Sequence, residues 1–91
     1  MTLLEMLKVD LRYTTDAFDD RLTQYITSAE QLIAKEGATL SPDDVPEDAQ
    51  LVVMYAAWLW RKRDSGEGMP RMLRYLLNNR IFSEKMRDAT T

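Results

Sequence analysis

The sequence predicts an all-α fold, a small orthogonal or up-down bundle of about four to five helices. Apolar residues recur at three- and four-residue spacing, and no apolar–polar alternation is long enough to indicate a strand. Glycine and proline residues separate the apolar segments. A chain of 91 residues fits one domain, so 1–91 is expected to form a single helical domain. Helices are predicted at about 2–8, 17–36, 47–63 and 70–78, with a partly frayed tail at about 83–91.

The second predicted helix, about 17–36, has the clearest pattern. Its apolar residues fall on one side of a helical wheel and polar residues on the other. Thr14, Thr15 and Asp16 precede it as N-cap candidates, and Gly37 suits the position just after its last residue. The core residues expected from this segment are Phe18, Leu22, Ile26, Leu32 and Ile33.

The third predicted helix contains "LVVMYAAWLW", ten consecutive apolar residues that begin at Leu51. Pro46 suits its first turn. The side predicted to face the core carries Leu51, Met54, Tyr55, Trp58 and Leu59. The opposite side carries Val52, Val53, Ala56, Ala57 and Trp60. Two interpretations of this second side stand: the chain's own helices cover it, or part of it lies in an interface with a second copy.

The fourth predicted helix follows Pro70 and ends at about Asn78. Apolar residues repeat along it, and Leu73 and Leu76 are expected in the core. Beyond it, Ile81 and Phe82 are expected to dock back on the core before the tail frays.

Residue types argue against catalysis. The chain has neither cysteine nor histidine, so it lacks a thiolate nucleophile, the commonest zinc ligand and the usual neutral-pH base. Its adjacent acids, such as those at 43–44 and 47–48, lie at predicted helix starts or in a loop. We therefore expect no catalytic residue, no cofactor and no metal site. We also expect a soluble protein, because no stretch matches a secretory signal or a membrane span.

Charge is distributed unevenly along the chain. Residues 1–50 carry four bases and eleven acids, a net −7, and residues 51–91 carry eight bases and four acids, a net +4. This pattern favours a head-to-tail contact between copies, and head-to-tail contacts that close make rings. The candidate basic side of that contact comprises Trp60, Arg61, Arg63, Glu67, Arg71 and Arg74. The candidate acidic side comprises Asp16, Asp19, Asp20, Asp43 and Asp44.

The alternative function is nucleic-acid binding in packaging or regulation. It would use the bases at 61–63 and those near the C-terminus. The acidic pI of about 4.8 and the strongly acidic first half oppose it.

Three stretches of the sequence carry a family resemblance. The first, "LRYTTDAFDDRLTQYITSAEQLIAKEG", supplies Leu11, Arg12, Asp19, Asp20, Leu22, Ile26 and Ala29. The second, "VPEDAQLVVMYAAWLWRKRD", supplies Ala49, Val53, Ala56, Leu59, Trp60 and Arg63, and "LLNNR" ends in Arg80. On these residues, over about 3–82, the chain resembles the head–tail connector family, the small helical head-completion adaptors of tailed phages and prophages.

The resemblance implies a structural role. Such an adaptor would form a ring below the portal protein, extend the DNA channel without sequence-specific binding, and dock a neck or tail-completion protein. It would reside in the virion neck, after assembly in the host cytoplasm, and would touch no membrane.

Overall fold

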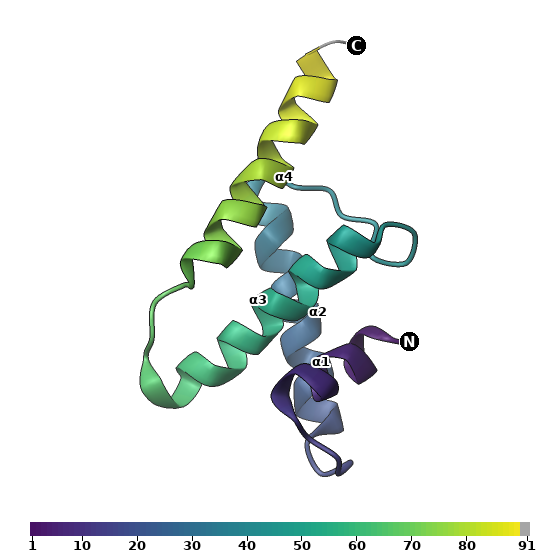
Figure 1. Ribbon diagram of the computed structural model, residues 1–91, viewed down its shortest axis with the longest axis vertical. Helices are drawn as coiled ribbons and strands as arrows, with labels where there is room; N and C mark the ends of the chain where they lie inside the picture. The colour runs from purple at the N-terminus through teal and green to yellow at the C-terminus, as the bar shows by residue number, and fades with distance from the viewer. Residues whose placement is uncertain (90–91) are drawn as a thin grey trace.

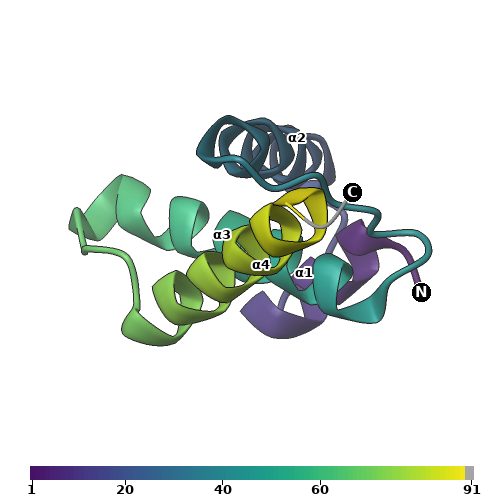
Figure 2. The same ribbon diagram turned by 90° about the horizontal axis from the view of Figure 1, so that it is seen from above.

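The structure is a computed structural model that describes residues 1–89. It is an all-α bundle of four helices: α1 (Leu3–Leu11), α2 (Asp19–Glu36), α3 (Pro46–Ser65) and α4 (Arg71–Ala89), with no strand among the described residues. The α3 helix packs against each of the other three and crosses α2 (Figure 1). Seen from above, α2 lies along one side of the molecule with α3 and α4 beside it (Figure 2). The predicted fold class is therefore confirmed.

The ends of the helices follow local sequence signals in most places. Thr2 and Glu5 form a capping box at the start of α1, in which each side chain accepts a hydrogen bond from the other residue's backbone amide. Gly37 ends α2 with a left-handed φ of 111°, and Pro46 is in the first turn of α3. The predicted caps at 14–16 are wrong: Phe18 is the N-cap of α2, and no side chain caps it. Thr15 instead accepts a hydrogen bond from the Ala17 amide within the loop.

The second side of α3 is covered by the chain itself. Val52, Ala56 and Ala57 have no exposed surface, and Val53 and Trp60 are almost fully buried. Of the two interpretations, the structure supports cover by the chain's own helices, because α1 and α2 both pack against α3. Val53 also borders an open depression. The two alanines have short side chains, and neighbouring helices can approach closely at such positions.

Trp60 lies in a cluster of aromatic rings that joins three parts of the chain. Its ring centroid lies 5.3 Å from that of Tyr25 on α2, 5.7 Å from that of Phe18 and 6.1 Å from that of Tyr13. Its indole Nε1 donates a hydrogen bond of 3.0 Å to the Tyr13 hydroxyl. Edge-to-face contacts of this kind add to the stabilisation from apolar burial, so this cluster fastens the α1–α2 connection to α3.

The core differs from the prediction at several positions. Phe18 and Leu32 were expected to be buried, but both are exposed. The Phe18 ring still contacts those of Tyr13 and Trp60, and Leu32 lies at the edge of the buried face of α2. Met54, Trp58 and Leu76 are partly buried and pack against the core. The other predicted core residues are buried: Leu22, Ile26, Ile33, Leu51, Tyr55, Leu59 and Leu73.

The α4 helix is much longer than predicted. It continues past Asn78 through the segment expected to fray and ends at Ala89, and its last turns extend beyond the other helices (Figure 1). Residues 90–91 of the predicted tail lie outside the described residues. Ile81 packs against the core as expected, but Phe82 is exposed. The helix is held beyond Asn78 by polar contacts of Arg80 and Glu84, which an apolar pattern does not reveal.

Candidate functional site

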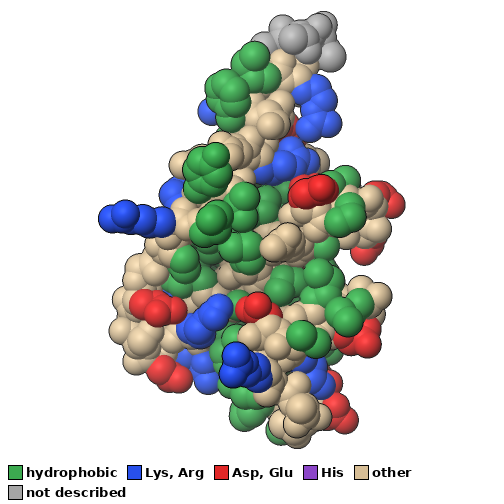
Figure 3. All heavy atoms as spheres, in the orientation of Figure 1, with side chains coloured by type: hydrophobic (Ala, Val, Ile, Leu, Met, Phe, Trp, Pro, Cys, Tyr) green, Lys and Arg blue, Asp and Glu red, His purple; other side chains and the backbone are tan. Residues whose placement is uncertain are grey.

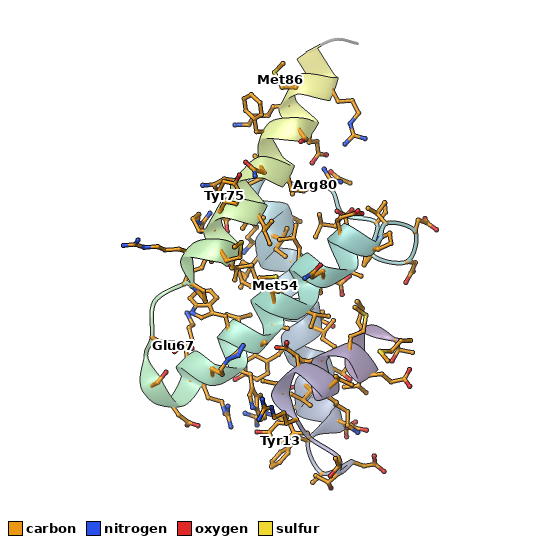
Figure 4. All side chains as sticks on the ribbon, viewed as in Figure 1. Tyr13, Met54, Glu67, Tyr75, Arg80 and Met86 are labelled. Atoms are coloured by element: carbon orange, nitrogen blue, oxygen red, sulfur yellow. The ribbon has the colours of Figure 1, made fainter. Side chains whose placement is uncertain are left out.

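A stripe of exposed apolar side chains runs along the outer face of α4. Met72, Tyr75, Phe82 and Met86 are each between 52% and 63% exposed. Their positions, with Asn79 between Tyr75 and Phe82, follow alternating three- and four-residue steps, which place all five on one side of a helix. Figure 4 shows Tyr75 and Met86 pointing away from α3. We call these five residues the α4 stripe.

Basic residues flank the α4 stripe. The helix carries five bases and two acids, and Arg71 and Lys85 are exposed beside the stripe. In Figure 3, hydrophobic side chains gather along α4 toward the top of the view, with Lys and Arg side chains next to them. Large exposed apolar patches with a polar rim mark interaction sites more often than chance exposure does. The stripe is therefore the strongest candidate for a functional surface.

A buried ion pair fixes the helix that carries the stripe. Asp48, in the first turn of α3, has no exposed surface. Its Oδ1 accepts a hydrogen bond of 2.9 Å from Arg80 Nε, and its Oδ2 accepts one of 2.9 Å from the Ser41 amide. Arg80 also donates to the Thr39 carbonyl at 2.8 Å. One arginine of α4 thus holds the α2–α3 loop and the start of α3 together.

Glu84 adds a second tie one turn further along α4. Its Oε2 accepts a hydrogen bond of 2.7 Å from the Thr39 amide and lies 3.7 Å from Arg80 Nη1. Hydrogen bonding from the backbone and side chain of Thr39 lowers the pKa of Glu84 below its ordinary value, and the charge of Arg80 acts in the same direction. These contacts hold the middle of α4 in place while the side chains of its outer face stay exposed.

The pKa of Asp48 is also lowered. Burial acts to raise it, but the hydrogen bonds from Arg80 and from the Ser41 amide, together with the Arg80 charge, outweigh burial. The hydrogen bond between Arg80 and Asp48 raises the pKa of Arg80. Both groups are therefore charged at neutral pH, and the pair is an ion pair.

A second apolar surface lies in a depression between α1 and the first half of α3. Its apolar lining residues are Met6, Val9, Pro46, Val53 and Met54, and its polar ones are Asp10 and Gln50. Val9 is 68% exposed, and Figure 4 shows Met54 on the near face of α3. One acid, Asp10, lines this region, and the exposed acids Asp43 and Asp44 lie in the loop that leads to Pro46. In Figure 3, Asp and Glu side chains gather near the right-hand edge, over the α2–α3 loop. We call this region the α1–α3 depression.

The predicted basic interface residues divide into two groups. Trp60, Arg61, Arg63 and Glu67 line one open hollow with residues 10–13. Trp60 is buried there, so it is not available for a contact between copies. Arg61 lies 3.7 Å from the Asp10 carboxylate. The Arg63 guanidinium stacks 3.6 Å from the Trp60 ring centroid and donates to the Trp60 carbonyl.

The other two predicted basic residues lie on α4. Arg71 is exposed at its start, and Arg74 pairs with Glu36 of α2 at 2.7 Å. Three arginines of the second half, Arg61, Arg74 and Arg80, therefore pair with acids of the first half inside one chain. Much of the charge that was predicted to attract a second copy therefore forms ion pairs within one chain. These arginines are correspondingly less available to bind phosphates.

The predicted acidic interface residues lie in two separate loops and the start of α2. Lys8 lies 2.9 Å from the Asp19 carboxylate and 3.4 Å from that of Asp16. Asp20 is exposed in the first turn of α2. Asp43 and Asp44 are exposed in the α2–α3 loop, which follows the opposite end of α2 from Asp19 and Asp20 (Figure 1). The structure therefore does not unite these five acids in one patch.

Two features of the site escaped the sequence prediction. The α4 stripe follows regular three- and four-residue steps, and that spacing could have revealed it if the helix had been extended past Asn78. The Asp48–Arg80 pair gave no signal, because its members are 32 residues apart and Asp48 also fits the acid-favouring start of a helix.

The described residues contain no group of three or more acids that could hold a metal ion. Within the same part of the chain, no helix has the length and apolar character needed to cross a bilayer. No family model, curated protein or solved structure matches the chain.

Proposed function

We propose that this chain is a non-enzymatic assembly protein, whose work is to bind other protein subunits. The observation that carries the proposal is the exposed α4 stripe, on a domain whose other helices bury most of their apolar residues in one core. A protein of this size gains little by exposing Tyr75, Phe82 and two methionines to water. Their exposure is explained if a partner covers them.

Within that class, we propose a head–tail connector adaptor of a tailed phage or prophage. The support is the resemblance of the sequence over about 3–82 and the all-α fold that the resemblance implies. In this proposal the subunits assemble head-to-tail into a ring below the portal protein. The ring extends the DNA channel and docks a neck or tail-completion protein.

The adaptor proposal predicts self-assembly that depends on concentration and on salt. Light scattering and negative-stain imaging over a wide concentration range, at low and moderate salt, test it directly. Closed rings that loosen as salt rises are expected, because screening weakens contacts between exposed charges. A strict monomer at every concentration and salt would contradict self-assembly into a ring.

A further inference from the structure

The molecule has two unpartnered apolar surfaces of opposite charge, and they lie on different helices. The α4 stripe is flanked by bases, and the α1–α3 depression is bordered by acids. We propose that the α4 stripe of one copy docks in the α1–α3 depression of the next copy. This inference rests on the proposed function for its occupant, a second copy of the chain.

The side chains of the two surfaces can pack together, because one surface carries an aromatic ring and the other carries flexible methionines. The last turns of α4 extend beyond the other helices (Figure 1). Phe82 and Met86 lie toward that end of α4 and are exposed, so a neighbour can reach them. The depression offers Val9 and the methionines Met6 and Met54. Methionine side chains are flexible and favour contact with aromatic rings. An aromatic ring such as that of Phe82 can therefore be accommodated among them.

Charge decides between a head-to-tail contact and a two-fold one. A two-fold contact would place the α4 stripes of two copies together and bring Arg71 and Lys85 of each copy close to the bases of the other, which is unfavourable. In a head-to-tail contact, the same bases approach Asp10, which lines the depression and is about half exposed beside Arg61. They also approach the exposed Asp43 and Asp44 of the α2–α3 loop, which ends at Val45 just before Pro46 of the depression. Because the two surfaces are different, each copy can bind two neighbours, as a ring requires.

A second hollow, between the first half of α3 and α4, suits the stripe less well. Leu51 and Leu76 give it apolar walls, and Glu47 and Arg80 line it as well. Because Arg80 is paired with Asp48, charge does not separate the two hollows, and the position of the second one does. Part of its wall is also α4 itself, so a neighbour's stripe would lie close to the stripe of the same copy.

Cross-linking between single-cysteine variants tests the inference, since the natural chain has no cysteine. Asn79→Cys and Val9→Cys place one thiol on each surface, at exposed positions, and keep the large apolar side chains of the stripe. The two variants are mixed in equal amounts under mild oxidation, and the disulfide-linked products are identified by non-reducing electrophoresis and mass spectrometry. The matched control replaces Val9→Cys with Thr27→Cys, a thiol on the exposed side of α2.

The expected result is a mixed dimer linked between positions 79 and 9, at least about tenfold enriched over the 79–27 dimer of the control, because a disulfide requires closely approaching Cβ atoms. Dimers linked mainly between two residues 79 would overturn the inference in favour of a two-fold contact. Rings of the natural chain without enrichment of the 79–9 dimer would overturn the inference and leave the adaptor proposal standing. No self-association together with no enrichment would overturn both. Enrichment of the 79–9 dimer in open filaments would support the inference and contradict the closed ring.

Discussion

The two longest helices, α3 and α4, differ in how far their apolar residues are buried. Both helices carry apolar side chains on more than one side. Most of those of α3 are covered by α1, α2 and α4, so that nine of them are buried, and Met54 and Trp58 are partly buried. Those of α4 are divided: Leu73 and Leu77 are buried, and the α4 stripe on the opposite side is exposed. An apolar helix side thus indicates a contact, but only the neighbours in the fold decide whether that contact is within the chain.

The side chains of the covered side of α3 are smaller than those of the exposed side of α4. On its second side α3 has Ala56 and Ala57, which let other helices come close. The outer side of α4 instead carries the larger Tyr75, Phe82 and Met86, and no other described helix covers them. Large aromatic side chains and methionine are typical of interfaces between proteins, so the side of α4 that resembles an interface is the one left free.

The largest expected effect comes from comparing an aromatic residue of each helix. Trp60→Ala removes the buried centre of the aromatic cluster and should lower the free energy of unfolding by about 3–5 kcal/mol. Tyr75→Ala removes an exposed ring from the stripe and should change it by less than about 0.5 kcal/mol. Urea denaturation of the monomeric fraction measures both. Equal losses in the two variants would contradict the assignment of one ring to the core and the other to a binding surface.

The next effect concerns the attachment of α4. Arg80→Met leaves the Asp48 carboxylate buried without its partner and should cost about 3 kcal/mol of stability. Arg74→Met breaks a pair with Glu36 that is substantially exposed and should cost no more than about 1 kcal/mol. The same denaturation experiment compares the two. If Arg80→Met were as mild as Arg74→Met, the buried pair would not be what fixes α4.

Acidification should weaken the attachment of α4 and so lower the free energy of unfolding. The pKa of Asp48 is lower in the folded protein than its ordinary value of 3.8, so the carboxylate contributes stability fully above that value. The contribution is lost as the pH falls through 3.8 and then through the lower folded pKa. Stability measured against pH should therefore fall on acidification. Asp48→Asn, which cannot titrate, should flatten this fall; an unchanged acid profile in that variant would contradict the role of Asp48.

The smallest effect concerns the turn between the two helices. Gly66 ends α3 with a left-handed φ of 66°, whereas Gly68 has no positive φ, and neither position has atoms near an added Cβ. Gly66→Ala should therefore cost about 1 kcal/mol from backbone strain alone. Gly68→Ala is the matched control and should cost less. Thermal unfolding of the two variants gives the comparison, and equal midpoints would show that the turn does not require the left-handed conformation.

The sequence predicts those parts of the fold that depend on local chemistry. The apolar spacing of α2 identifies Leu22, Ile26 and Ile33 as buried, and Gly37 and Pro46 mark helix ends correctly because each acts through its own backbone. It misplaces the end of α4, because Asn78 and Asn79 are weak helix formers and interrupt the apolar pattern.

The site is harder to predict than the fold because it depends on contacts between distant residues. Trp60 looked like an interface residue, and only the packing of Tyr13 and Tyr25 around it shows that it is internal. The unequal charge of the two halves predicted ion pairs between copies. In the structure, Arg74 and Arg80 of the second half instead form ion pairs with acids of the first half within one chain. Sequence position alone does not distinguish these two uses of the same residue types.

The central claim is that the α4 stripe binds another subunit while the apolar sides of α3 build the core. Sedimentation velocity of the double variant Phe82→Ser, Met86→Ser tests it most directly, alongside the natural chain at the same concentrations and salt. The expected result is a natural chain that assembles and a variant that sediments as a folded monomer with an unchanged free energy of unfolding. Assembly of the variant to the same extent as the natural chain would contradict the claim.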